Sequence, residues 1–185
     1  METTFRTVTT EVINSFTEIS GKENVLFDPE SLDRYSHDET EDLRYLPEIV
    51  VKPGSTEEIS RIMKICNAHA IPVTPRGAGT GLSGGALPVQ RGVVLSLERL
   101  NKIIEIDERN LQATVEPGVI TETFQMAAAE KGLFYPPDPA SKGSCFLGGN
   151  LSESSGGPRA VKYGTTKDYV LNLEMVLPNG DITWT

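Results

Sequence analysis

A strand–helix–strand pattern between residues 48 and 97 places the strongest constraint on how this 185-residue chain can fold. The apolar, β-branched run "EIVVKP" (48–53) predicts a buried strand, and "STEEISRIMKICNAHA" (55–70) predicts a helix. Apolar residues recur on one face of this helix at Ile59, Ile62, Met63 and Cys66. "IPVTP" (71–75) and "GVVLSL" (92–97) predict two further strands. Because a helix that joins strands of one sheet in this way makes them parallel, we expect a parallel βαβ unit.

The segments before this unit predict helices. The first 20 residues have the apolar spacing of a short amphipathic helix, and the acidic stretch 28–47 predicts a short helix followed by a surface loop. Ser55 and Glu58 have the spacing of a capping box at the start of the central helix.

The segments after it predict antiparallel pairing. Apolar alternation on either side of "DERN" predicts a hairpin over 104–115, and "ITETFQMAAAEKG" predicts a helix that ends at Gly132. The proline-rich stretch 133–144 predicts irregular structure. Asn179–Gly180 predicts the turn of a last hairpin. Because the sequence stops within the second strand of that hairpin, we expect it to be part of a longer protein.

The composition argues against several function classes. A formal net charge of −9 disfavours a general binder of nucleic acid or of a membrane surface, because phosphate groups recruit basic patches. No apolar run approaches the ~20 residues that span a bilayer, so we expect no transmembrane segment. The two cysteines, Cys66 and Cys145, lack metal-ligand spacing and predict reduced thiols in a cytoplasmic protein. With His37 and His69 as the two histidines, we expect no metal site.

The stretch "TPRGAGTGLSGGALP" (74–88) contains a literal G-x-G-x-x-G at residues 79–84. A Rossmann fingerprint needs a strand before it, a helix at its last glycine and an acid about 20 residues later. The strand is expected and Glu98 could supply the acid, but Pro88 and Gly92 would disrupt the helix. Two alternatives remain: a flexible surface turn, or a loop whose backbone N–H groups form an anion-binding nest.

The apolar strands on both sides favour the nest, because they mount the loop rigidly. The loop also offers the hydroxyls of Thr80 and Ser83 and the cation of Arg76. A second stretch, 136–164, is also rich in glycine and serine. We interpret both stretches as loops, and two such loops in one small chain suggest one long ligand that touches both.

Together, "PRGAGTGLSGGALP" and "YPPDPAS…GGNLSESSGG…KYGTTKDYV" closely resemble the FAD-linked oxidases of the vanillyl-alcohol oxidase and p-cresol methylhydroxylase type. "PEIVVKPGSTEEIS" and "FDPESLDRYSHDET" also match the segments that precede the first motif in that family. The resemblance runs from about residue 20 to the end. Within the family, the chain is most similar to the glycolate oxidases and the D-lactate dehydrogenases.

The resemblance implies an α+β fold, the FAD-binding domain of the p-cresol methylhydroxylase type, with two α+β subdomains and FAD extended between them. Residues 1–46 would form an N-terminal helical arm, and residues 47–100 the first subdomain, a small parallel βαβ unit. Residues 101–185 would form part of the second, larger subdomain, a mixed and largely antiparallel sheet with helices. The C-terminal cap domain of the family would be absent.

The resemblance also implies which residues contact FAD. The first motif would wrap the diphosphate with backbone N–H groups, and the second would approach the ribityl chain and the flavin and complete the cradle. The implied contacts are Arg76, Gly77, Ala78, Gly79, Thr80, Gly81, Gly85, Pro137, Asp138, Ser141, Ser144, Gly148, Gly149, Asn150, Ser154, Gly156 and Gly157. Relatives that bind FAD covalently often carry His at the position of Thr80, which implies non-covalent FAD here.

The implied function is the FAD-binding part of a flavin-dependent dehydrogenase or oxidase that oxidises a small D-2-hydroxy acid of the glycolate or D-lactate class. A hydride would pass to flavin N5. The implied partners are the hydroxy acid and an electron acceptor or partner redox subunit. For the full-length protein, peripheral association with a membrane stays open as an alternative. Because the family's substrate-binding residues lie in the cap domain, no catalytic residue is assigned and this part alone is expected to be inactive. Two alternatives stay open: an FAD-linked oxidase of another substrate class, or a non-catalytic nucleotide-binding subunit.

Overall fold

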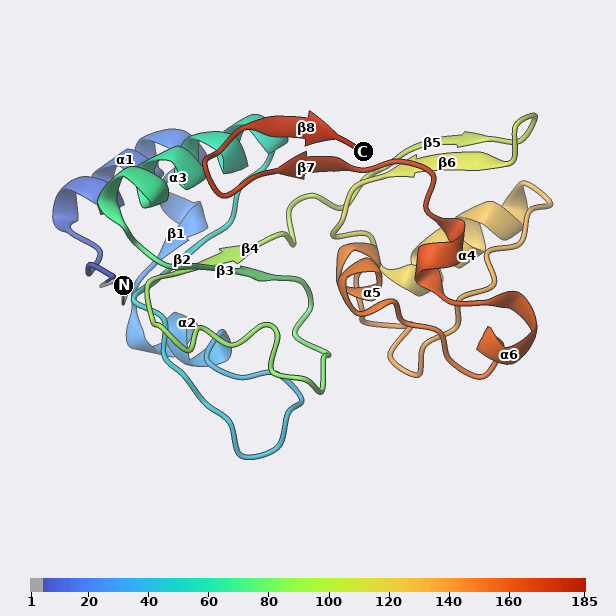
Figure 1. The fold of residues 1–185 in the computed structure, drawn as a ribbon, viewed down its shortest axis with the longest axis horizontal. Helices are drawn as coiled ribbons and strands as arrows, with labels where there is room; N and C mark the ends of the chain where they lie inside the picture. Colours follow the sequence, from blue (N-terminus) through green and yellow to red (C-terminus); the bar gives the residue numbers. More distant parts are fainter. Residues whose placement is uncertain (1–4) are drawn as a thin grey trace. The chain divides into compact units, whose positions relative to one another are not determined.

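The chain forms two compact units in a computed structural model, which describes residues 5–185 (Figure 1). The first unit contains the described residues up to Arg99 together with Asn172–Thr185, and the second contains Leu100–Leu171. This boundary lies close to the expected division at residues 100 and 101, but the C-terminal hairpin packs with the first unit rather than the second. The limits of the three expected domains stay predictions.

The first unit is built on a four-stranded sheet in the order β1–β2–β4–β3. β1 pairs antiparallel with β2, whereas β2 and β3 both run parallel to β4, so the predicted parallel unit is confirmed. The elements are α1 (Thr10–Ser20), a 3₁₀ turn (Lys22–Asn24), β1 (Val25–Leu26), α2 (Pro29–Arg34), β2 (Ile49–Val51), α3 (Thr56–His69), β3 (Val73–Arg76), β4 (Val93–Ser96), β7 (Glu174–Val176) and β8 (Ile182–Trp184).

Helices α1 and α3 cover one face of this sheet, and α2 lies on the other side (Figure 1). Phe16 of α1 and Ile62 of α3 are fully buried against Ile49 of β2 and Val93 of β4. Each side chain of this size that leaves water stabilises the fold by about 1.5–3 kcal/mol. The continuous apolar runs of β2 and β4 and the helical spacing of apolar residues in α3 therefore meet in one core. This core makes the sheet a rigid base for the loops at the ends of its strands.

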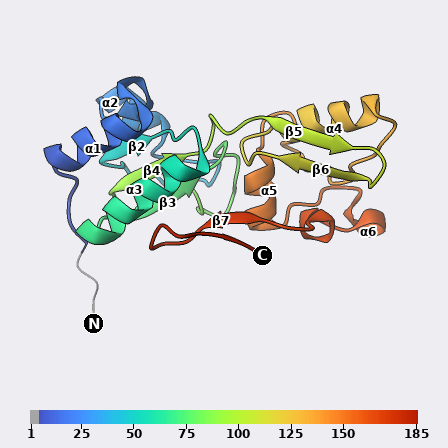
Figure 2. The same ribbon diagram turned by 90° about the horizontal axis from the view of Figure 1, so that it is seen from above.

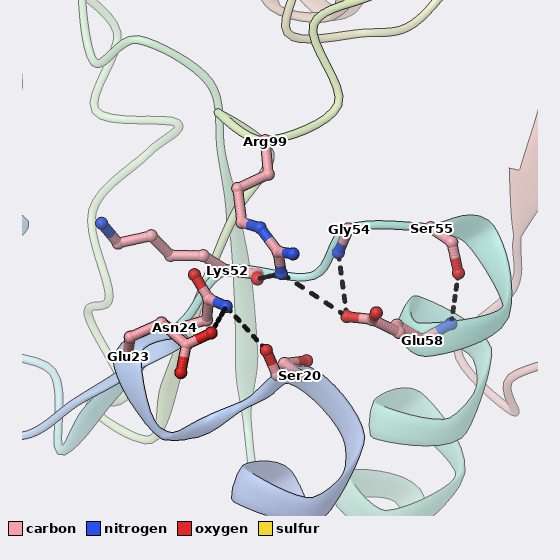
Figure 3. A network of polar contacts seen from close by, with 8 residues as sticks. All are labelled: Ser20, Glu23, Asn24, Lys52, Gly54, Ser55, Glu58 and Arg99. Atoms are coloured by element: carbon pink, nitrogen blue, oxygen red, sulfur yellow. Dashed lines mark hydrogen bonds and ion pairs between the residues drawn. The ribbon is translucent and has the colours of Figure 1, made fainter.

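The start of α3 is tied to neighbouring segments by polar contacts (Figure 3). Ser55 Oγ accepts a hydrogen bond from the Glu58 N–H at 3.2 Å, which confirms one half of the predicted capping box. The Glu58 carboxylate accepts instead from the Gly54 N–H at 2.9 Å, one residue before the expected position, and lies 3.8 Å from Arg99 Nη1. Arg99 also donates to the Lys52 carbonyl at 2.8 Å. The segments that follow β2 and β4 are thereby joined to the helix.

The second unit combines a hairpin with helices (Figure 2). The predicted hairpin and the predicted end of a helix at Gly132 are both confirmed, and Leu133 N–H closes that helix end on the Ala128 carbonyl at 2.9 Å. The core contains Val119, Phe124 and Leu147. The elements are β5 (Ile103–Asp107), β6 (Gln112–Val115), α4 (Thr121–Glu130), α5 (Leu147–Glu153), α6 (Ala160–Tyr163) and a 3₁₀ turn (Thr166–Tyr169).

Helix α5 is a departure from the sequence analysis, which treated the second glycine-rich stretch as a loop. Two glycines in seven residues disfavour a helix. Tertiary contacts outweigh this preference, because Leu147 is buried in the core and the Gly148 N–H donates to the Pro117 carbonyl at 2.8 Å. A Cβ at Gly148 would lie 2.7 Å from Pro117 Cβ, so this close approach requires glycine. None of the described helices is long and apolar enough to cross a membrane.

Candidate functional site

The glycine loop of the first unit, residues 77–92, leaves the carboxyl end of β3 and leads into β4. In sheets with parallel strands, ligands bind beyond the carboxyl ends of the strands. The loop contains turns and bends but no helix. This confirms that its G-x-G-x-x-G is not a Rossmann fingerprint.

The backbone of this loop offers a row of unused donors. Within the described part of the chain, no hydrogen-bond partner is found for the N–H groups of Ala78, Gly79, Thr80 and Gly81. A Cβ built at Gly81 would meet no described atom within 4 Å, so a ligand could approach the backbone there. Consecutive unpaired amides in a glycine-rich loop are typical of an anion-binding nest. The loop can therefore hold an anion with little help from cationic side chains.

Arg76 lies underneath this loop, with 8% of its surface exposed. A Cβ at Gly79, whose φ is +76°, would collide with Arg76 Nη2, so the guanidinium lies against the inner side of the turn. The guanidinium carbon lies 5.5 Å from the ring centroid of Tyr35. No hydrogen-bond partner of Nη1 is found within residues 5–185. Burial lowers the pKa of Arg76, and the nearby carboxylates of Asp38 and Glu98 oppose that shift.

A polar cluster around Glu98 adjoins Arg76 at the same edge of the sheet. Glu98 accepts from the Tyr35 hydroxyl at 2.9 Å and from Ser96 Oγ at 3.1 Å, and it pairs with Lys52 Nζ at 2.8 Å. Burial opposes the ionisation of Glu98, but these hydrogen bonds outweigh it and the pKa of the carboxyl lies below its ordinary value. Burial and the bond to Glu98 raise the pKa of Tyr35.

Sequence reasoning missed this cluster and considered Glu98 only for its spacing from Gly79. The available signal was the order of the strands. Lys52 directly follows β2, and Ser96 is the last residue of β4. Because these two strands pair in parallel, both residues lie at the same end of the sheet. Tyr35 carried no such signal, because it lies outside the strands.

In the second unit, the turn around Asp138 is held by its own backbone and by two cations. Asp138 N–H donates to the Gly156 carbonyl at 2.8 Å, and its carboxylate lies 2.9 Å from Lys142 Nζ and 3.5 Å from Arg159 Nε. The hydrogen bond from Lys142 holds the pKa of Asp138 below its ordinary value. A Cβ at Gly157, whose φ is +85°, would collide with the Asp138 carbonyl. Gly157 thus has a structural role at this contact.

The other predicted residues near this turn differ in exposure. Pro137 is buried, and its carbonyl accepts from Gln125 Nε2 at 2.7 Å. Ser144 is exposed and its hydroxyl donates to the Ser141 carbonyl at 3.2 Å. Gly156 lies close to Ala160, since a Cβ there would be 2.8 Å from Ala160 Cβ.

The predicted residues on α5 divide into inward and outward groups. Asn150 is 2% exposed, and its Nδ2 donates to Thr121 Oγ1 at 2.6 Å, so this amide supports the core. Ser154 Oγ lies 2.9 Å from Thr165 Oγ1. Gly149 is exposed, and a Cβ there would meet no described atom within 4 Å. Within the described residues, no partner is found for its N–H group either. Of this set, Gly149 offers an open backbone surface to a ligand.

Fold and loop together are typical of a cofactor-binding domain. The family model described as an FAD binding domain matches residues 47–185, and the chain belongs to this family. The structure is similar to p-cresol methylhydroxylase with substrate bound, with a TM-score of 0.82 and 31% sequence identity over 96% of this chain and 36% of that chain. The expected α+β fold of the p-cresol methylhydroxylase type and the cofactor FAD are thereby confirmed.

Two curated relatives are similar over almost the whole chain. Glycolate oxidase subunit GlcD of Bacillus subtilis is 50% identical over 177 residues, which cover 95% of this chain and 37% of that protein. D-lactate dehydrogenase of Anaerostipes hadrus is 43% identical over 179 residues, which cover 96% of this chain and 37% of that protein. The chain thus spans little more than a third of the length of these relatives.

The observed groups fit FAD. In the glycine loop, four consecutive amides without a partner among the described residues suit the two phosphates, and the open flank of Gly81 leaves room for a ligand against the backbone. Because the net charge of the chain is −9, backbone donors rather than a basic patch would have to neutralise the diphosphate.

Proposed function

We propose that this chain is the FAD-binding part of a flavin-dependent oxidoreductase that oxidises a small D-2-hydroxy acid of the glycolate or D-lactate class. The main support is the glycine loop, which combines unpaired amides with a place at the carboxyl edge of parallel strands. The names of the two curated relatives support the substrate class. Their similarity covers the region of both glycine-rich stretches.

The proposed contacts to FAD follow the chemistry of each segment. The amides from Gly77 to Gly81 would bind the diphosphate, with the Thr80 hydroxyl as a further donor. In the second unit, Gly149 would let its backbone approach the cofactor, and Ser141 and Ser144 would offer hydroxyls. Arg76, Asn150 and Gly157 would act by holding the two segments in shape, because their described contacts are internal.

The chemistry that FAD supplies in such enzymes is acceptance of a hydride, here from the carbinol carbon of the hydroxy acid. This chain's own residues would bind and orient the cofactor. Thr80 stands where related proteins with covalent FAD often carry histidine, so we expect the cofactor to dissociate on denaturation. Electrons would leave through an acceptor or a partner redox subunit.

The test uses the complete gene product that contains this chain. Purified protein is expected to show a flavin absorption band at about 450 nm. After denaturation, the released flavin should pass through a filter that retains the protein. Reduction of a dye by glycolate, D-lactate or D-2-hydroxyglutarate would then identify the substrate. A colourless protein that takes up no added FAD would refute the proposal, and bound FAD without activity towards any of the three acids would refute the substrate class.

Gly81→Val provides a variant that fills the open flank of the loop. We expect it to weaken FAD binding at least about tenfold, because its side chain would occupy space next to the unpaired amides. Val89→Ala is the matched control, since Val89 is an exposed residue of the same loop beyond the amides. Equal affinities of the two variants would argue against this loop as the diphosphate site.

A further inference from the structure

We propose that residues 35–45, which precede the matched family domain, form a clasp that positions the glycine loop for FAD, and that Thr40 is its central positioning residue. This inference rests on the proposed function. From its sequence, this acidic segment is expected to be a solvated surface loop. In the structure it is bonded to the part of the loop that follows the unpaired amides.

Two hydrogen bonds join the clasp to the glycine loop. Thr40 Oγ1 accepts from the Gly84 N–H at 2.9 Å, although the two residues are 44 positions apart in the sequence. The Glu39 N–H donates to the Gly81 carbonyl at 3.1 Å. Both bonds involve backbone groups of the loop, so they restrain its path directly. Gly81 is thereby fixed through its carbonyl, while no partner for its N–H is found among residues 5–185.

The clasp has the internal bonds that such a role requires. Tyr45 N–H donates to the Ser36 carbonyl at 2.8 Å, which closes the segment into a loop of its own. Thr40 N–H donates to Asp38 Oδ1 at 2.9 Å. Ser36 is fully buried and Asp38 is 7% exposed. The backbone of Thr40 is therefore held by a buried neighbour on its own segment, next to the side chain that bonds Gly84.

The clasp is also anchored to the sheet below the loop. Tyr35 donates its hydroxyl proton to Glu98 at 2.9 Å, and its ring lies against the Arg76 guanidinium, 5.5 Å from the guanidinium carbon. Arg76 in turn lies against Gly79. The glycine loop is thus supported from below by Arg76 and restrained at Gly81 and Gly84 by the clasp.

The charge of the clasp indicates how it acts. Four acidic residues lie between positions 38 and 42, next to a loop expected to bind a diphosphate. Like charges repel, so this segment cannot favour FAD by attraction. Its contribution must come from the neutral hydroxyl of Thr40 and from the backbone, which fix the amides in place before the cofactor binds. Such preorganisation lowers the cost of ordering the loop on binding.

The first experiment measures the dissociation constant of FAD from the apoprotein of the complete gene product. Thr40→Val keeps the shape of the side chain but removes the hydroxyl acceptor, and we expect it to weaken FAD binding by about five- to tenfold. Thr40→Ser keeps the acceptor and is expected to stay within about twofold of the parent protein. Arg44→Ala is the matched control, because Arg44 pairs with Asp33 on the exposed side of the same segment.

A second measurement tests, in the absence of FAD, whether the clasp restrains the glycine loop. Hydrogen exchange of the Gly84 amide in the apoprotein is expected to be faster in Thr40→Val than in the parent, and near the parent rate in Thr40→Ser. Glu39→Gln removes a charge but leaves the backbone bond, and it is expected not to weaken FAD binding. Weakening of FAD binding by Glu39→Gln would show that charge, not positioning, carries the effect.

The outcomes separate the two proposals. If the parent protein binds no FAD, the proposed function fails, and the exchange of Gly84 still decides whether the clasp restrains the loop. If the parent binds FAD but Thr40→Val binds it equally well, the clasp has no positioning role. Equal weakening by Thr40→Val and Thr40→Ser would likewise overturn it, because the shared hydroxyl would then not matter.

Discussion

Arg76 and Tyr35 stack beneath the glycine loop, with the guanidinium carbon 5.5 Å from the ring centroid. This contact joins the end of β3 to a residue 41 positions earlier in the sequence. Because the guanidinium also lies against Gly79, the shape of the loop depends on a cation inside the unit. Arg76 was expected to contact FAD, which stays a prediction, and its buried side chain lies against the turn at Gly79.

Arg76→Ala is therefore expected to destabilise the protein. The change leaves a void under Gly79 and removes a cation that interacts with the buried Asp38 carboxylate. We expect a loss of about 2–3 kcal/mol in the free energy of unfolding, measured by urea denaturation. Arg91→Ala is the control, since Arg91 is an exposed arginine with a 3.8 Å ion pair to Glu48, and it should change stability by less than about 0.5 kcal/mol. Equal losses in the two variants would contradict the supporting role of Arg76.

Gly149→Ala is expected to separate stability from cofactor binding. Its Cβ would meet no described atom within 4 Å, and Gly149 lies within helix α5, so the change should stabilise the fold by about 0.5–1 kcal/mol. If its open flank is a contact surface for FAD, the same methyl group should weaken FAD binding severalfold. Thermal unfolding of the apoprotein and titration with FAD measure the two effects.

Gly157→Ala should give the opposite pattern for stability. Its φ of +85° and the collision with the Asp138 carbonyl are expected to cost about 2–3 kcal/mol in the free energy of unfolding.

The effect of Gly149→Ala on FAD binding is controlled by Gly143→Ala, because Gly143 is an exposed residue of the same segment that is not assigned to the cofactor. An apoprotein destabilised by Gly149→Ala, or unchanged FAD affinity, would contradict the role given to Gly149.

Glu98→Gln is expected to change the acid stability of the protein. The pKa of Glu98 lies below its ordinary value of 4.5, so its ionised form stabilises the folded state above that pH. This contribution is lost as pH falls from 4.5 through the lowered pKa in the folded state. The parent protein should therefore lose stability more steeply below pH 4.5 than Glu98→Gln does, as measured by denaturation at several pH values. Glu41→Gln, at an exposed position, should follow the parent profile, and a Glu98→Gln profile as steep as the parent's would refute the prediction.

Cys66 is expected to be unreactive in the folded protein. Burial raises the pKa of its thiol from 9.0 to about 12, and only the thiolate attacks disulfide reagents. The unfolded chain releases this proton at lower pH than the folded chain, so stability should fall as pH rises from 9.0 towards 12. Cys66→Ala should lack this part of the pH dependence. Rapid labelling of Cys66 in the native protein by a thiol reagent at pH 8 would disprove the assignment.

The sequence by itself determined many of the helices, strands and turns of this protein. It also determined that the glycine loop is not a Rossmann fingerprint. The period of apolar residues predicted the parallel strands and α3, and the turn residues at Asn179–Gly180 predicted the last hairpin, because both signals lie within a few neighbouring residues. Pro88 and Gly92 were enough to exclude a Rossmann helix. Resemblance then supplied the fold type and the cofactor.

The tertiary structure alone decided how distant segments meet. It placed Arg76 beneath Gly79, bonded Thr40 to Gly84, and formed α5 from a glycine-rich stretch. It also brought the last hairpin back to the first unit, where the Ser60 hydroxyl donates to the Gly180 carbonyl. These contacts join residues that are far apart in the chain or are too small to leave an apolar pattern. They depend on packing and on single hydrogen bonds, which leave no signal in the spacing of apolar residues along the sequence.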